Sequence, residues 1–130
     1  MADNDTILVF CCENSALKAV DSMDNTALRD SVDIIKLPCS GKIETGFVLK
    51  CFEKGCGGVI ILGCPLDNCK FLKGNYRARK RVAMIKKSLH KAGINENRVT
   101  IDFVSSVDTH KVVNIIEEMK ISITEQRIQK

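Results

Sequence analysis

Four short apolar runs, each followed by a stretch with helical spacing, constrain the fold of this chain most strongly. The runs are TILVF, VDIIKLP, GVIILG and RVTIDFVSS, at residues 6–10, 32–38, 58–63 and 98–106. Each is short and rich in β-branched residues, which is typical of a strand. In the intervening segments, apolar residues recur every three or four positions, which predicts helices near residues 13–23, 43–55, 75–93 and 108–120.

Alternating strands and helices with short connections predict a parallel sheet with helices on both faces. We therefore expect an α/β fold, with a four-stranded parallel sheet in a three-layer arrangement that is flavodoxin-like in outline. A chain of 130 residues fits a single domain, 1–130. Residues 1–5 and about 121–130 are expected to be flexible ends, unless the last helix extends into the tail.

The start of the chain, MADNDTILVFCC, is acidic where a signal peptide would be basic, and its apolar stretch is too short for a membrane span. We expect a cytoplasmic protein without a membrane span. In a reducing compartment, the seven cysteines are not expected to form a disulfide framework, and their odd number prevents complete pairing. Three uses then remain for them: metal or cluster ligands, redox thiols, or small buried apolar residues.

Five cysteines lie at or beyond the ends of the predicted strands. Cys11 and Cys12 end the first, Cys39 follows the second, and Cys64 and Cys69 follow the third. The carboxyl ends of parallel strands share one edge of a sheet, so these thiols are expected to converge there. Four converging thiolates can hold an iron–sulfur cluster or a tetrahedral zinc, and unliganded redox thiols are a third alternative.

The dispersed spacing favours a cluster, because structural zinc sites usually contain paired C-x₂₋₄-C knuckles. Successive strand side chains point to opposite faces, so only one of Cys11 and Cys12 is expected to be a ligand. Cys12 is favoured because it lies further along the chain. Cys51 shares a predicted helix face with Phe47 and is expected to be a small core residue, and Cys56 is expected to have only a packing role.

At these residues the sequence resembles a known family, the iron–sulfur (delta) subunit of methyl-viologen-reducing hydrogenase. The elements that carry the resemblance are FCCENSA, CSGK, GCPLDNC and GNY, within residues Thr6 to Met119. The family implies a [2Fe-2S] cluster, which position by position would be held by Cys12, Cys39, Cys64 and Cys69. Where the family has a second cysteine after the first strand, this chain has Ser15, which leaves Cys11 as a possible substitute ligand.

The resemblance further implies an electron-transfer subunit of anaerobic metabolism. Its expected partners are a flavoprotein subunit of the heterodisulfide reductase type and a hydrogenase, a formate dehydrogenase or another oxidoreductase. The alternative is a zinc-stabilised or thiol-bearing interaction module without a redox cluster. A dithiol oxidoreductase using Cys64 and Cys69 is a weaker alternative, since C-x₄-C is an unusual spacing for that chemistry.

A basic tract follows the third strand. Nine lysines and arginines and no acidic residue lie between Asn68 and Asn95, which differs from the mixed charge usual on exposed helices. The interpretations are a solvated helix face or a docking surface for an acidic partner, with Arg77, Arg79, Lys80 and Arg81 as the docking residues. No nucleic-acid-binding motif accompanies the tract. No Ser-His-Asp or paired-carboxylate arrangement is evident, so we expect no catalytic residue and no substrate chemistry in this chain.

Overall fold

The computed structural model describes residues 6–12, 16–23, 30–37, 45–63, 74–105 and 107–128. Its strands are β1 (Ile7–Cys12), β2 (Val32–Leu37), β3 (Gly58–Gly63) and β4 (Val99–Phe103). Its helices are α1 (Ala16–Asp21), α3 (Thr45–Glu53), α4 (Gly74–Lys91) and α5 (Thr109–Ile128), with a short 3₁₀ helix, η3 (Glu96–Arg98), before β4. Each of the four predicted strands and each of the four predicted helices is therefore present.

The strands form one four-stranded sheet in the order β2-β1-β3-β4, with every neighbouring pair parallel. The order places β1 and β3 in the centre and β2 and β4 at the edges. The predicted α/β class with an all-parallel sheet is thereby confirmed. After β2 the chain crosses over β1 to add β3 on its other side, so the direction of winding reverses between β1 and β3.

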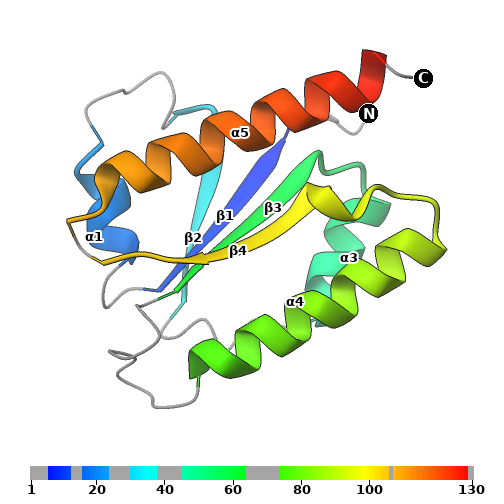
Figure 1. Cartoon of the computed structure of the whole chain (residues 1–130), viewed down its shortest axis with the longest axis horizontal. Coiled ribbons are helices and arrows are strands. Elements are labelled where there is room, and N and C mark those ends of the chain that lie inside the picture. The colour runs from blue at the N-terminus through cyan, green and yellow to red at the C-terminus, as the bar shows by residue number, and fades with distance from the viewer. Residues whose placement is uncertain are drawn as a thin grey trace.

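Helices cover both faces of the sheet, as the three-layer arrangement requires (Figure 1). Helices α1 and α5 pack together on one face, and α3 and α4 pack together on the other. The strand residues divide between the layers by the two-residue period of a strand. In β3, Ile60 and Leu62 pack toward α1 and α5, whereas Val59 and Ile61 pack toward α3 and α4.

Strand β3 is the most deeply buried element, with all six residues buried. A strand covered by helices on both faces needs apolar side chains at every position, which explains the uninterrupted run GVIILG. At the other end of the chain, α5 continues to Ile128. The predicted last helix therefore extends through residues 121–128 of the tail.

Candidate functional site

The carboxyl ends of β1, β2 and β3 lie side by side, and this edge is where the sequence predicts the cysteine site. Cys12, the last residue of β1, is the register partner of Leu37, the last residue of β2. On the other side of β1, Cys11 pairs with Leu62, so β3 ends one residue later at Gly63. In the sequence, Cys39 follows Leu37 by two positions and Cys64 follows Gly63 directly.

Three of the four predicted ligands lie outside the described residues: Cys39, Cys64 and Cys69. Among the residues that the structure does describe, no three His, Cys, Asp or Glu side chains are close enough to hold a metal ion. Convergence of the four thiols therefore stays a prediction. What the structure contributes is the placement of Cys12 and of the two strand ends from which the chain continues to Cys39 and to Cys64.

Cys11 and Cys12 do not point to opposite faces as expected. Both side chains are buried, at 0% and 1% exposure, and both belong to the core between the sheet and helices α1 and α5. Cys11 follows the strand period, because Ile7 and Val9 face the same layer. The expectation is wrong for Cys12, which is the last residue of β1 and packs in the same core as Cys11 although it still pairs with Leu37 of β2.

Cys11 is a poorer candidate ligand than Cys12. Its thiol is directed back toward the Val9 carbonyl oxygen, at 4.0 Å. Burial, with a smaller contribution from Asp21, raises the pKa of Cys11 to about 12, so its sulfur is a neutral thiol at neutral pH. Cys12 lies one residue closer to the edge and keeps its predicted role.

The donor set fits an iron–sulfur cluster in its chemistry. Four cysteine thiolates are the usual ligands of [2Fe-2S] clusters, and zinc accepts the same donors. Parallel sheets bind ligands in the crevice at their carboxyl edge, at the point where the strand order reverses. Here that point lies between β1 and β3, whose ends are Cys12 and Gly63.

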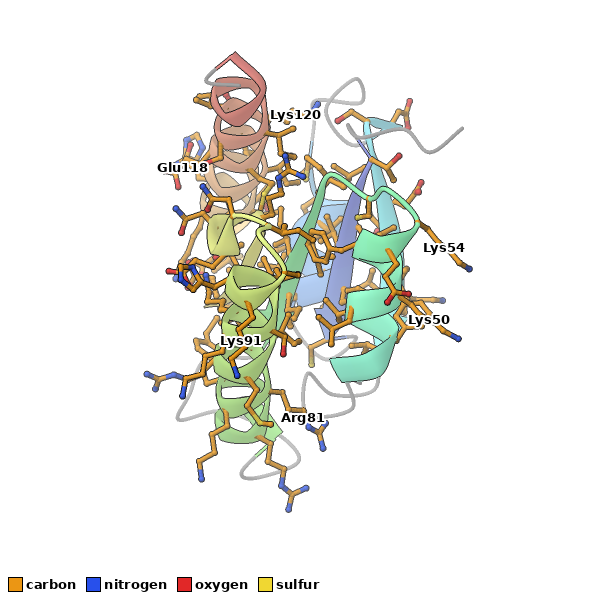
Figure 2. All side chains as sticks on the ribbon, turned by 90° about the vertical axis from the view of Figure 1, so that its right-hand side faces the viewer. Lys50, Lys54, Arg81, Lys91, Glu118 and Lys120 are labelled. Carbon is orange, nitrogen blue, oxygen red and sulfur yellow. The ribbon has the colours of Figure 1, made fainter. Side chains whose placement is uncertain are left out.

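The cations of the basic tract that the structure describes lie on α4. Arg77, Arg79 and Lys80 are exposed, whereas Arg81 is partly buried. The first turn of α4 carries no acidic residue, and its last turn ends in His90 and Lys91. Figure 2 shows Arg81 and Lys91 on α4, with Lys50 on the neighbouring α3 and Lys54 directly after it. Helix α4 begins at the end of the molecule where β3 finishes, so its first turns lie toward the same edge as Cys12 (Figure 1).

A second pair of cysteines, Cys51 and Cys56, lies at the opposite edge of the sheet and was not predicted as a site. Cys51 is not a core residue as expected: it is partly exposed, and with Cys56 it lines a cavity of about 210 Å³ beside the start of β1. Cys56 lies just before β3 and packs against the core between the sheet and helices α3 and α4, as expected, and its thiol also donates to backbone carbonyls. The five-residue spacing of these two cysteines was visible in the sequence. It did not predict a shared site, because the turn that the chain makes after α3 was not known.

Comparison with known proteins identifies the family. The family model of the methyl-viologen-reducing hydrogenase delta subunit matches residues 7–126, nearly the whole chain. This chain belongs to that family. Among its relatives is the iron-sulfur subunit of the F420-non-reducing hydrogenase vhu of Methanocaldococcus jannaschii, which is 31% identical over 115 residues, or 87% of this chain and 86% of that protein. The iron-sulfur subunit of the F420-non-reducing hydrogenase vhc of Methanococcus voltae is 35% identical over 115 residues, which are 85% of this chain and 80% of that protein.

A relative of a different kind is one of the subunits of the ferredoxin/F420H2-dependent CoB-CoM heterodisulfide reductase of Methanosarcina acetivorans. It is 26% identical over 114 residues, which make up 86% of this chain but only 14% of that protein. The family and these relatives together support an electron-transfer-related subunit. In the part of the chain that the structure describes, the helices are too short or too polar to cross a membrane.

Proposed function

We propose that this chain is an electron-transfer subunit that carries a [2Fe-2S] cluster at the carboxyl edge of its sheet. Cys12, Cys39, Cys64 and Cys69 would hold the cluster. The observation that supports this most directly is the register of β1 with β2 and β3, in which Cys12 adjoins the strand ends that lead to Cys39 and Cys64. The names of the relatives, which are iron-sulfur subunits of hydrogenases, point to the same kind of cofactor.

When bound, such a cluster accepts and releases one electron at a time. The contribution of this chain would be to supply four thiolates, one of them from Cys12 at the end of β1. Because β1 and β3 are central and buried, the ends that carry Cys12 and lead to Cys64 are fixed by packing on both faces. A cofactor held in this way changes its surroundings little between oxidation states, which favours rapid electron transfer.

The proposed partner is a flavoprotein subunit of the heterodisulfide reductase type. A segment similar to this chain forms 14% of a CoB-CoM heterodisulfide reductase protein in Methanosarcina acetivorans. In that protein the similar segment is one part of a longer chain of a heterodisulfide reductase, which supports a partner of this type. The electron donor would be a hydrogenase, a formate dehydrogenase or another oxidoreductase.

We further propose that α4 is the docking surface for that partner. Three of its exposed cations, Arg77, Arg79 and Lys80, lie in the first turns, toward the cysteine edge. A cationic surface without acidic residues is complementary to an acidic one, and this complementarity increases the association rate and orients the encounter. Docking through these turns would bring the partner close to the cofactor, as electron transfer requires.

The cluster is tested on protein purified without oxygen. We expect iron and acid-labile sulfide in a ratio of about one to one, and an electron paramagnetic resonance signal after reduction. Replacing Cys39 by Ser should abolish the signal, whereas the matched variant Cys51→Ser should retain it. Zinc without acid-labile sulfide would instead support the zinc-stabilised interaction module.

The choice between Cys11 and Cys12 has its own test. Cys12→Ser should lose the cluster, and Cys11→Ala should keep it, with a loss of stability of about 1 kcal/mol from the small cavity left in the core. If Cys11→Ala loses iron while Cys12→Ser retains it, then Cys11 is the ligand and the assignment is wrong.

The docking surface is tested by charge reversal. At low salt, the variant Arg77→Glu/Arg79→Glu should associate about 10-fold more slowly with the flavoprotein, with the difference shrinking as salt is added. The control Lys18→Glu/Lys36→Glu changes the net charge equally at two other exposed positions and should have a smaller effect. Equal slowing by both pairs would show that net charge, not the α4 surface, governs docking.

A further inference from the structure

Helix α3 ends in a hydrogen-bonded cap that connects Cys51 and Cys56. The Cys56 N–H donates to the Cys51 carbonyl at 3.0 Å, and the Gly55 N–H donates to the Phe52 carbonyl at 3.1 Å. Gly55 has a φ of +94°, in the left-handed region. These two bonds around a left-handed glycine define a Schellman motif, in which the residues at the positions of Cys51 and Cys56 commonly have side chains in contact.

Helix α4 ends in the same motif, which provides an internal comparison. There the Ile94 N–H donates to the Leu89 carbonyl at 2.9 Å, and Gly93 is the left-handed residue with a φ of +80°. The side chains at the two equivalent positions, Leu89 and Ile94, both pack in the core between the sheet and helices α3 and α4. In α3 these two positions are both occupied by cysteines.

The cap brings the backbones of the two cysteines close together. A disulfide spans Cα atoms about 4.4–6.8 Å apart. Between the Cα atoms of Cys51 and Cys56 there are only one carbonyl group, one hydrogen bond and one N–Cα bond. Both residues are free cysteines in this structure, so the pair is in its dithiol form.

The pair is also accessible to small molecules. Cys51 and Cys56 line the cavity of about 210 Å³ together with Thr6, Leu8, Lys54 and Gly55. Neither side chain is fully buried. Figure 2 shows Lys54 at the end of α3, where its side chain projects away from the sheet. A small disulfide can therefore approach the pair past a cationic side chain.

We propose that Cys51 and Cys56 are a thiol–disulfide exchange site, at which a small-molecule disulfide of the glutathione type converts the two thiols into an intramolecular disulfide. The site is independent of the proposed cluster, because it lies at the opposite edge of the sheet. The six residues of β3 separate the two edges by roughly 20 Å, at about 3.3 Å per residue.

The two thiols have different roles in the exchange. Burial raises the pKa of Cys51, and the nearby Lys54 ammonium partly opposes that effect. Cys56 donates its S–H to the Gly58 carbonyl at 3.1 Å and lies 3.5 Å from the Thr6 carbonyl oxygen. Burial raises the pKa of Cys56 to about 11. Cys51 is therefore the attacking thiol and Cys56 the resolving thiol.

The exchange balances in two steps. Cys51 loses its proton to solvent and attacks one sulfur of the small disulfide, which releases one small thiol and leaves a mixed disulfide on Cys51. Cys56 then loses its proton and attacks the Cys51 sulfur, which forms the Cys51–Cys56 bond and releases the second small thiol. The two protein thiols are oxidised, and one small disulfide is reduced to two thiols.

The test is to incubate anaerobically purified, cluster-loaded protein with oxidised glutathione, alkylate the remaining thiols and map the peptides without reduction. Trypsin cleaves after Lys50 and Lys54, so the new bond links peptide 51–54 to peptide 55–70. The second peptide also contains Cys64 and Cys69, and fragmentation assigns the bond to Cys56. We expect a Cys51–Cys56 bond that dithiothreitol reverses.

Two single variants distinguish the roles. Cys56→Ser should stop at the mixed disulfide on Cys51, whereas Cys51→Ser should leave Cys56 unmodified. Both should retain the iron content and the electron paramagnetic resonance signal of the parent protein. The proposal is overturned if both thiols remain alkylatable after glutathione treatment, if Cys51 pairs with Cys64 or Cys69, or if either variant loses iron.

Discussion

At the scale of single residues, the surroundings of each thiol determine what it can do. Cys11 is enclosed in the core, where burial raises its pKa to about 12, and it is chemically inert at neutral pH. Cys51 has the same kind of thiol but is partly exposed beside a lysine. The seven cysteines therefore cannot be treated as one class, and only their positions in the fold separate them.

Gly58, at the start of β3, has no room for a side chain. A Cβ atom there would lie 2.7 Å from the Met119 Sδ and 3.3 Å from the Arg98 carbonyl oxygen. Met119 can adjust, but the backbone oxygen cannot, so Gly58→Ala should reduce the free energy of unfolding by about 1–3 kcal/mol. Urea denaturation measures the change.

The matched control for Gly58 is Gly46, which lies in α3 and has nothing within 4 Å of an added Cβ. Gly46→Ala should leave stability unchanged or raise it by up to about 1 kcal/mol, since alanine is the better helix former. If both variants were equally destabilised, close packing at Gly58 would not be the cause.

Asp108, next to the first residue of α5, provides a pH-dependent contribution. Its Oδ2 accepts a hydrogen bond from the Ser105 N–H at 2.7 Å, which holds the pKa of Asp108 below its ordinary value of 3.8. Because the folded-state pKa is the lower one, the carboxylate stabilises the fold above the ordinary value, and this contribution is lost as pH falls through the lowered pKa.

Asp108→Asn keeps an oxygen acceptor but does not titrate. The wild-type protein should therefore be the more stable of the two at pH 7, and the difference should shrink as the solution is acidified. Thermal unfolding of both proteins over a pH series measures it. A difference that stays constant down to the lowest pH would mean that the Asp108 charge does not contribute.

At the scale of elements, α3 and α4 end in the same way but with different side chains in the same two places. Both helices have the left-handed glycine and the two backbone hydrogen bonds, although the two side chains at the cap are thiols in α3 and apolar in α4. The cap is therefore a property of the backbone, and the chemistry at the cap depends on which side chains occupy it.

Gly93→Ala tests this cap in α4. A residue with a Cβ atom at a φ of +80° costs about 1–2 kcal/mol, and Gly93 has open space around it, so the cost would come from the backbone alone. Ser88→Ala, at an exposed position in the same helix, is the control and should not be destabilising. The free energy of unfolding is measured by chemical denaturation. If Gly93→Ala were as stable as the parent protein, the left-handed backbone at this position would not be strained by a side chain.

At the scale of the whole molecule, two separate cores share one sheet. One core lies between the sheet and helices α1 and α5, and the other lies between the sheet and helices α3 and α4. Strands β1 and β3 contribute alternate side chains to both, so neither core can come apart without disturbing the central strands. The molecule is expected to unfold in a single transition.

Ile60 and Ile61 are adjacent and fully buried, and they belong to different cores. Ile60→Val and Ile61→Val should each cost about 0.5–1.5 kcal/mol, because each removes one buried methylene. Both variants should retain one cooperative transition when near-ultraviolet and far-ultraviolet circular dichroism are followed together. Two separated transitions in either variant would mean that the layers unfold independently.

Much of this fold could be predicted from the sequence, because strand and helix periodicities are local. The run GVIILG predicted β3 with its bounds, and the alternation of elements predicted the parallel sheet and its helical layers. The parallel arrangement in turn predicted that Cys12 ends its strand at the carboxyl edge. These inferences need only the pattern of neighbouring residues and the general geometry of parallel sheets.

Other features depend on contacts between distant segments, and only the tertiary structure decided them. The order β2-β1-β3-β4 placed the reversal of winding beside Cys12, and packing at the end of β1 placed Cys12 in the same core as Cys11. The start of β1 packs beside the end of α3, which made a cavity at Cys51 and Cys56. Local periodicity can be read from neighbouring residues in the sequence. The surroundings of a side chain also depend on residues that are distant in the sequence and become neighbours only in the folded chain.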